Sequence, residues 1–402
     1  MKREIRGFLV GVLVTSLLTG TLAFASQGTK IIEAFYDDIK IFIYGSEVTP
    51  RDAGGAIVEP FRYNGTTYLP VRAISEALGH EVTWVEEAKS VYIGNLPAEL
   101  HFAKLDERMR EAEKEPVTEV TVSTVDELIS ELGSNKVINL KPGVYDLSKA
   151  TIESTDNVYW SEVYDGLQLN IKGLVNLVLS GDENEKTEIV TTPSYAEILN
   201  FEDCGNITIL NIRAGHTPRE YECDAGVLSF YNCKSVSVYG CYLYGCGSIG
   251  ISLNFVDNFL CKESIITDCS LRGIDIFNST NIEFVDTKIT KNRAYASVIS
   301  VSSDSTVTFT GCEISENNNI EWDLIEASGN SILTFNDCII KDNQTSEENE
   351  PNMFNSCWFD FLDSATIALN NCIIENNKSW IEYNGEKPIY NDCVFNDNDF
   401  LN

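Results

Sequence analysis

Seven copies of one hydrophobic pattern occupy the second half of the chain. Each copy has a small residue, an apolar residue two positions later, and apolar residues three and five positions earlier. The small residues are Cys241, Ser264, Thr287, Cys312, Cys338, Cys372 and Cys393. They are separated by 23, 23, 25, 26, 34 and 21 residues. A constant pattern at variable spacing indicates fixed strands joined by variable loops, which is typical of a solenoid.

Apolar and polar residues alternate within each copy, which is the period of a β-strand rather than a helix. A third alternating pair precedes five of the copies. These pairs are Ile251 and Leu253, Ile274 and Ile276, Ile299 and Val301, Ile325 and Ala327, and Phe359 and Phe361. Three strands per repeat predict a right-handed parallel β-helix, in which equivalent residues stack about 4.8 Å apart. The chain is therefore expected to be mainly β.

Asparagine recurs five positions after the small residue, at Asn292, Asn317, Asn343, Asn377 and Asn398. Asparagine tolerates the left-handed backbone conformation, and its amide can bond backbone groups that a tight turn leaves unpaired. We therefore predict a ladder of side-chain amides along one corner of the β-helix.

The first 25 residues have the pattern of an export signal. Lys2, Arg3 and Arg6 precede an apolar run over 8–22, and an Ala-x-Ala cleavage pattern follows at 23–25. An uncleaved membrane anchor is the alternative, because the run is close to the minimum spanning length. Either way we expect the protein outside the cytoplasm or at the cell surface. No second apolar span is present, so none is expected to cross the membrane in the mature chain.

Residues 31–95 are predicted to form a small α+β domain. Asn64-Gly65 is a strong hairpin signal, and a helical pattern from residue 71 ends at Gly79. Residues 96–117 form a charged, helix-prone linker, and residues 118–402 form the β-helix. A capping box at 124–127 begins a short helix that we expect to cover the N-terminal end of the β-helix.

The run NGTTYLPVRAISEALGHEVTWVEEAKSVYIG, at residues 64–94, resembles the copper amine oxidase N-terminal-like stalk domain of exported bacterial proteins. The resemblance implies a spacer or surface-attachment module. It implies no copper here, because His80 and His101 have no companions at ligand spacing.

The short helix, the run KPGVYDL at 141–147 and the repeats resemble the pectin-lyase-like superfold. The motifs that identify the pectate lyases and polygalacturonases of that superfold are absent from the sequence. The resemblance therefore implies a fold and not an activity.

The net charge of the chain disfavours some classes of binding partner. The chain has 61 Asp and Glu against 29 Lys and Arg, a net charge of −32. Such a surface repels nucleic acid and slows the approach of a polyanion such as pectate. We expect no cofactor, although Ca²⁺ would suit acidic ligands.

All 12 cysteines lie between residues 204 and 393. Export would favour disulfides, but seven cysteines occupy equivalent stacked positions, where strand spacing exceeds the Cβ separation of a disulfide. We therefore interpret most of them as buried small hydrophobic residues. A bond between Cys223 and a corner cysteine such as Cys246 is the exception that we considered.

The first candidate site is an insertion at 213–226, where the repeat is interrupted. Loops on a rigid scaffold are where function is concentrated. His216 and Arg219 are candidate catalytic residues, and Glu220 and Asp224 are candidate ligand-binding residues. The simpler interpretation is that His216 supports a turn at 217–218.

The second candidate is the outward residue of the third strand, a position that includes Asp275, Glu326 and Asp360. We predict Glu326 and Asp360 on adjacent rungs, with Asp275 two rungs from Glu326. Paired carboxylates could serve a retaining or an inverting glycosidase, depending on their separation, or could hold Ca²⁺. An acidic chain will also place carboxylates on outward positions by chance.

The third candidate is aromatic: Tyr159, Trp160 and Tyr164, in the run NVYWSEVYDG. Exposed aromatic rings on a flat β-face suit stacking against sugars. Aromatic rings that face inward would belong to the core instead.

The leading hypothesis is an exported surface protein that binds carbohydrate or cell envelope without catalysis. The alternatives are a polysaccharide lyase or glycoside hydrolase, and a purely structural surface protein. We expect no capping helix after Asn398, and we therefore expect the C-terminal end either to be covered by self-association or to be protected only by Asp397 and Asp399.

Overall fold

The computed structural model describes residues 31–401 except 53, 81, 87, 95, 218–222, 246–247, 347–351, 356–364 and 381–385. The chain divides into two compact units, residues 1–96 and 97–402, and each is described by itself. The predicted export signal, residues 1–25, lies outside the described residues and stays a prediction.

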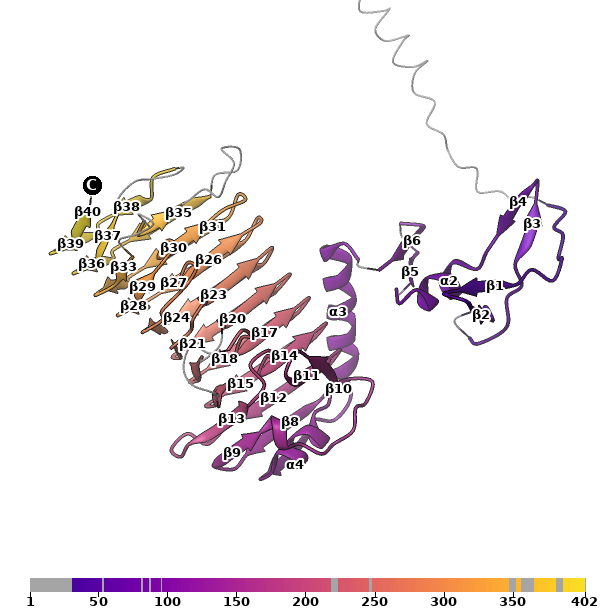
Figure 1. Cartoon of the computed structure of the whole chain (residues 1–402), viewed down its shortest axis with the longest axis horizontal. Helices are drawn as coiled ribbons and strands as arrows, with labels where there is room; N and C mark the ends of the chain where they lie inside the picture. Colours follow the sequence, from indigo (N-terminus) through magenta and orange to yellow (C-terminus); the bar gives the residue numbers. More distant parts are fainter. Residues whose placement is uncertain are drawn as a thin grey trace, which may run out of the picture. The chain divides into compact units, whose positions relative to one another are not determined.

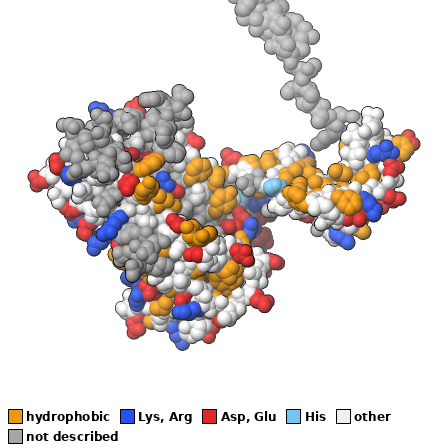
Figure 2. All heavy atoms as spheres, viewed as in Figure 1, with side chains coloured by type: hydrophobic (Ala, Val, Ile, Leu, Met, Phe, Trp, Pro, Cys, Tyr) orange, Lys and Arg blue, Asp and Glu red, His pale blue; other side chains and the backbone are white. Residues whose placement is uncertain are grey.

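Three two-stranded antiparallel sheets and a helix form the first unit. Its elements are β1 (Ile41–Ile43), β2 (Ser46–Val48), β3 (Phe61–Tyr63), β4 (Thr66–Tyr68), α2 (Val71–Ala77), β5 (Val82–Val85) and β6 (Ser90–Ile93). The turn between β3 and β4 has φ of 47° at Asn64 and 78° at Gly65, as the predicted hairpin requires. Few side chains are buried here, and Figure 2 shows hydrophobic side chains gathered on the visible face of this unit.

The second unit contains three long sheets, parallel except for β10 in the third, whose strands follow one another in turn around a coil (Figure 1). Among the described residues the first sheet has 11 strands, the second 10 and the third 9. The first comprises β7 (Thr118–Val122), β8 (Lys136–Leu140), β12 (Val175–Ser180), β15 (Gly205–Leu210), β18 (Lys234–Tyr239), β21 (Asp257–Lys262), β24 (Thr280–Val285), β27 (Thr306–Thr310), β31 (Ile332–Asn336), β35 (Thr366–Asn370) and β38 (Ile389–Asn391).

The second sheet comprises β9 (Gly143–Asp146), β13 (Thr187–Thr191), β16 (Arg213–His216), β19 (Tyr242–Tyr244), β22 (Ile265–Thr267), β25 (Lys288–Thr290), β28 (Glu313–Ser315), β32 (Ile339–Lys341), β36 (Ile373–Glu375) and β39 (Val394–Asn396). The third comprises β10 (Val158–Val163), β11 (Gly166–Lys172), β14 (Leu199–Glu202), β17 (Leu228–Tyr231), β20 (Ile249–Asn254), β23 (Arg272–Phe277), β26 (Ile299–Ser302), β30 (Ile325–Ala327) and β34 (Phe354–Asn355). A short corner sheet comprises β29 (Asn318–Ile320), β33 (Gln344–Thr345), β37 (Lys378–Trp380) and β40 (Asp399–Leu401).

Equivalent residues of successive coils pair in register, as predicted. Phe284 pairs with Phe309, and Phe309 pairs with Phe335. Their rings are stacked, with centroids 4.9 and 4.7 Å apart, and all three are fully buried. The repeat is therefore a continuous column of core contacts, and the predicted parallel β-helix is confirmed.

The small residues of the repeat are packing residues. Nine of the ten described cysteines are buried and Cys393 is half-buried; the nine are Cys204, Cys223, Cys233, Cys241, Cys261, Cys269, Cys312, Cys338 and Cys372. The Sγ atoms of Cys312 and Cys338 lie against backbone carbonyl oxygens of their own corner. Cys246, which we considered as a partner of Cys223, lies outside the described residues.

The predicted asparagine ladder runs along the corner between the second sheet and the corner sheet. The Oδ1 atom of Asn317 accepts the backbone N–H of Asn292 at 3.0 Å. The Nδ2 of Asn317 donates to Asn343 Oδ1 and to the carbonyl oxygen of Ile289, at 2.9 and 3.0 Å. The left-handed residue is the one before each asparagine, for example Glu316 with φ of 55°. The asparagine supplies the hydrogen bonds, and its neighbour makes the turn.

The predicted third strand at Phe359 and Phe361 is wrong. Phe354 pairs with Ile325, and Asn355 pairs with Glu326. This coil contains the longest interval of the repeat, 34 residues, and the alternating pair that we selected lies beyond the paired strand. Residues 356–364 lie outside the described part of the chain.

The helix-prone segment 96–117, which we interpret as a linker, is mostly helical. Helix α3 (Ala98–Ala112) belongs to the second unit and contacts β12 and β15. Leu105 on this helix is 1% exposed. Asp106 accepts a hydrogen bond from Lys234 at 2.9 Å, and the His101 ring bonds the carbonyl oxygen of Asn232. The helix is docked because partners distant in sequence meet its buried face.

A second short helix, α4 (Val125–Glu131), begins where the capping box predicts. The Glu127 N–H donates to Thr124 Oγ1 at 3.2 Å, and the Glu127 carboxylate accepts the N–H of Ser123. Leu128 and Ile129 are buried in the same core as the first strands. Its role as a cap of the β-helix stays a prediction. The 3₁₀ helix η1 (Leu147–Lys149) follows β9.

Replacing Asn317 by alanine should destabilise the β-helix by roughly 2–4 kcal/mol, because buried backbone groups lose their partners. Denaturant unfolding measures this loss. Asn318→Ala is the matched control, since Asn318 is exposed and its amide bonds only the nearby carbonyl of Glu316. Equal losses in both variants would contradict the proposed role of the ladder.

Replacing Leu105 by alanine should cost about 2–4 kcal/mol, the usual range for a buried leucine, and should expose 97–116 to proteolysis. Limited digestion followed by mass spectrometry detects the cleavage. Glu107→Ala, at an exposed position of the same helix, should leave the digestion pattern unchanged. A linker that is not docked would be cut equally fast in the parent chain.

Candidate functional site

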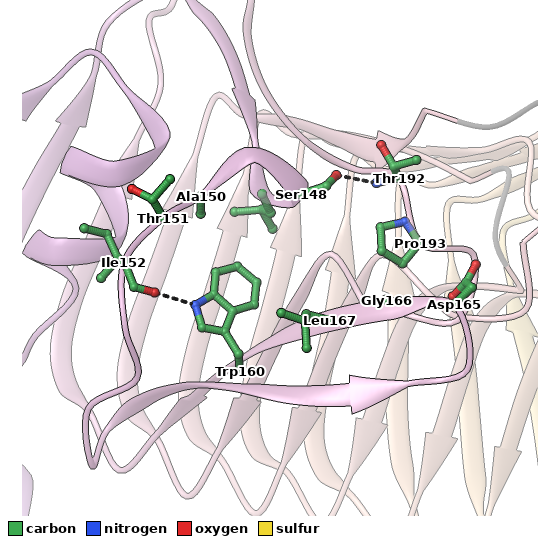
Figure 3. A pocket seen from close by; sticks show the side chains of 11 residues that line it. Ser148, Ala150, Thr151, Ile152, Trp160, Asp165, Gly166, Leu167, Thr192 and Pro193 are labelled. Carbon is green, nitrogen blue, oxygen red and sulfur yellow. Dashed lines mark hydrogen bonds between the residues drawn. The ribbon is translucent and has the colours of Figure 1, made fainter.

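A pocket of about 520 Å³ opens beside the hairpin that β10 and β11 form near the N-terminal end of the β-helix (Figure 3). Trp160 and Leu167 of the hairpin and Pro193 give it apolar walls. Its polar side chains are Ser148, Thr151, Asp165 and Thr192. Aromatic and aliphatic walls with a few directed polar groups are typical of small-ligand sites.

Hydrogen bonds fix the wall formed by 147–152. The Trp160 indole N–H donates to the carbonyl oxygen of Ile152 at 3.0 Å (Figure 3). The N–H and hydroxyl of Thr151 donate to the two carboxylate oxygens of Asp126, at 2.7 and 2.6 Å. This wall is therefore held by the hairpin on one side and by helix α4 on the other.

The opposite wall is a loop, residues 192–197, which Asp165 holds in place through hydrogen bonds. The Asp165 carboxylate accepts the backbone N–H groups of Ser194 and Tyr195, at 2.6 and 3.2 Å. Beside it, a Cβ on Gly166 would come within 2.5 Å of the Pro193 ring. The glycine is needed so that the hairpin turn can pack directly against the loop.

Two tyrosines lie next to the hydrogen bonds between Asp165 and the loop. Tyr164 is 89% exposed and Tyr195 is 43% exposed, and their ring centroids lie 5.1 Å apart. A hydrogen bond to the Asp224 carboxylate raises the pKa of the Tyr195 phenol. The sequence placed Tyr164 and Asp224 in separate candidate sites, and the loop brings them together.

His216 lies beneath the same loop, at the end of β16 rather than in an exposed insertion. Its Nε2 atom bonds the carbonyl oxygen of Ala196 at 2.8 Å, so Nε2 carries the proton. Its Nδ1 atom is buried and has no hydrogen-bond partner. Burial lowers the pKa of this ring, against smaller opposite effects of the hydrogen bond to Ala196 and of the Asp165 charge. The neutral ring supports the loop from behind.

Glu197, which the sequence did not suggest, is the last residue of the loop and is half-buried. Its Oε2 atom is buried without a partner. Burial raises the pKa of this carboxyl to about 7, although the backbone of Gly226 bonds it. No local signal marks this residue, because the groups around it, such as Gln168 and Gly226, come from other coils.

The predicted aromatic set does not form one platform. Trp160 forms a wall of the pocket, and Tyr164 lies at the hairpin turn. Tyr159, which alternates with Trp160 along β10, instead reaches Glu202, whose Oε2 lies 3.4 Å from its hydroxyl. Burial raises the pKa of the Tyr159 phenol. Only two of the three aromatic residues are therefore near the pocket.

The outward carboxylates of the third sheet lie elsewhere and are largely covered. Asp275 and Glu326 are two rungs apart, with Ser300 between them, as predicted. Glu326 is 4% exposed and accepts a hydrogen bond from the Ser297 hydroxyl at 2.8 Å. Burial raises the pKa of both carboxyls.

The rung beyond Glu326 holds Asn355 and not Asp360. The predicted pair of carboxylates on adjacent rungs is therefore wrong. Asp360 itself, like Arg219 and Glu220 of the insertion, lies outside the described residues. Asp275 and Glu326 are separated by two strand spacings, about 9.6 Å between backbones, so a retaining pair of adjacent carboxylates is not formed there.

No group of three or more His, Cys, Asp or Glu side chains among the described residues is arranged to hold a metal ion. His80 belongs to the first unit and His101 to the second.

Comparisons with known proteins match both parts of the chain. Residues 22–122 match the family model of the copper amine oxidase N-terminal domain, and residues 225–401 match that of the right-handed β-helix region. These matches confirm the two resemblances that the sequence suggested. The comparison with the curated proteins found no match.

Solved structures with a similar fold include a pectate lyase from Paenibacillus sp. 0602, with 10% identity over 68% of this chain and 80% of that chain and a TM-score of 0.44. An alginate lyase from Paenibacillus sp. FPU-7 has 10% identity, coverage of 71% and 99%, and a TM-score of 0.43. The surface adhesin PfbA of Streptococcus pneumoniae has 12% identity, coverage of 75% and 88%, and a TM-score of 0.29. Similarity at this level transfers no activity.

The Glu197 carboxyl should make stability depend on pH. Its pKa is about 7 in the folded chain against an ordinary 4.5, so folding tolerates the protonated form and disfavours the ionised form. Stability should therefore fall as pH rises from about 4.5 to 8, by up to about 3 kcal/mol. Glu197→Gln should remove this loss in denaturant unfolding measured at several pH values. Glu162→Gln, at an exposed position on β10, should keep it, and identical pH profiles for both variants would contradict the assignment.

Proposed function

We propose that the protein is exported and displayed at the cell surface, and that its β-helix binds a polysaccharide or another cell-envelope glycan. The binding site is the pocket between the β10–β11 hairpin and the loop 192–197. The small N-terminal unit serves as a spacer or attachment module. The N-terminal sequence of basic residues, an apolar run and Ala-x-Ala supports export. No helix in the described part of the chain is long and apolar enough to cross a membrane.

The main support for this proposal is the combination of apolar and polar side chains that line the pocket. Trp160 and Leu167 provide apolar surface for the C–H face of a sugar ring, and Ser148, Thr192 and Asp165 provide groups that can bond its hydroxyls. Tyr164, next to the pocket, is 89% exposed. An exposed aromatic ring beside a polar pocket suits amphipathic ligands such as sugars.

Binding accounts for these groups better than catalysis does. Asp165 already holds two backbone N–H groups of the loop, and His216 is buried behind it with Nε2 bonded to a carbonyl oxygen. A general base must come within hydrogen-bond reach of the substrate proton that it removes. Both side chains instead keep the loop in place.

Leu167→Ala and Tyr164→Ala should each weaken glycan binding about three- to tenfold, because each removes apolar contact area. A glycan array selects the ligand, and isothermal titration of the full chain measures the Kd. Tyr44→Ala is the matched control, since Tyr44 is 91% exposed in the other unit. If only the Tyr44→Ala control lost binding, the binding site would lie outside the β-helix. Trp160 is left intact because its indole holds the wall of the pocket.

A polysaccharide lyase or hydrolase is the second candidate, and Asp275 and Glu326 favour it. Glu326 is buried and Asp275 is half-buried, and this burial raises the pKa of both carboxyls, which is the property of a general acid. Assays for reducing ends and for unsaturated uronates, with and without Ca²⁺, test this candidate. Product that disappears in Glu326→Gln would establish catalysis, and neither binding nor product would leave a purely structural surface protein.

A further inference from the structure

The pocket contains a negative charge at a fixed position. Asp165 lines it, and the bonds from Ser194 and Tyr195 prevent the carboxylate from turning away. Asp224 lies close by, because its carboxylate is bonded to the Tyr195 phenol. The chain as a whole carries a net charge of −32. A ligand that approaches the pocket therefore meets negative charge at the pocket and at long range.

The same carboxylate can still bind a sugar. Each oxygen of Asp165 accepts one backbone N–H, and a carboxylate oxygen has a second lone pair for a further donor. A sugar hydroxyl or the N–H of an acetamido group is such a donor. The carboxylate of a uronic acid is only an acceptor, and at a contact distance of about 4 Å two like charges repel strongly outside bulk water.

We infer that the pocket binds glycans without acidic groups, such as neutral or N-acetylated hexoses, and rejects uronates, and that Asp165 determines this specificity. The inference rests on the proposed glycan binding and specifies its ligand class. The apolar walls bind the sugar ring irrespective of its charge. The Asp165 carboxylate accepts a hydrogen bond from a donor group of the ligand, and it repels an anionic group.

The test uses the full chain and oligosaccharides of equal length: oligomers of N-acetylglucosamine and of glucose against oligogalacturonate. At low salt the uncharged oligomers should bind at least about tenfold tighter than oligogalacturonate. The ratio should shrink as salt is raised to about 1 M, because screening weakens the repulsion. This salt series needs no variant, so it tests the inference even if a substitution disturbs the loop.

Asp165→Asn removes the charge and keeps one acceptor oxygen. It should bring the ratio of affinities close to one by improving oligogalacturonate binding, with melting temperature and near-ultraviolet circular dichroism checking that the chain is folded. Asp304→Asn is the matched control: it removes one carboxylate charge at an exposed position that does not line the pocket. In that variant the ratio should stay within about twofold of the parent value.

Three results would overturn the inference while the proposed function stands. They are equal binding of charged and uncharged oligomers, a ratio that does not respond to Asp165→Asn, and tight oligogalacturonate binding that Arg219→Ala abolishes. Arg219 lies outside the described residues, and the last result would show that it supplies a cation. Absence of binding by every oligomer would overturn the proposed function itself.

Discussion

The fold depends on stacking of identical positions at the spacing of one β-strand. Because each strand pairs in register with the equivalent strand of the next coil, an apolar side chain that faces inward meets its counterpart above and below. Phe284, Phe309 and Phe335 show the result as a column of parallel rings. At the corner, buried backbone N–H groups need hydrogen-bond partners in every coil. The side-chain amides of Asn317 and Asn343 supply them by accepting backbone N–H groups of the previous coil.

A scaffold built this way is regular along its length, so a site arises where the regularity is broken. β10 is the one antiparallel strand of the third sheet among the described residues, and it folds back on β11. The loop 192–197 faces it, and Asp165 joins the two through backbone N–H groups. The pocket lies between these irregular segments, while the regular coils hold them in position. His216 is buried behind the loop and bonds its backbone, and Glu197, the last residue of the loop, has a carboxyl oxygen that is buried without a partner.

The repeat could be predicted from sequence because alternation and spacing are local properties that recur. The one strand of the repeat that was predicted wrongly has a physical cause. Residues 359–361 alternate as a strand should, but pairing selected Phe354 and Asn355 in the longest coil. The segment 96–117 is charged and looks like a linker. It forms the docked helix α3 because Lys234 and other residues more than a hundred positions away contact it. The choice of the strand at 354–355 and the docking of α3 both depend on contacts with residues outside those segments.

The sequence by itself determined the coil, the core columns, the asparagine corner and the small N-terminal domain, because each follows from short-range periodicity or a contiguous motif. It also identified Trp160, Tyr164 and Asp224 as candidates, in two unrelated segments. Only the tertiary structure decided that these segments meet at one loop, and only it revealed Asp165 and Glu197. The physical reason is that the role of a polar side chain is set by burial and hydrogen-bond partners, and the loop and its partners come from different coils.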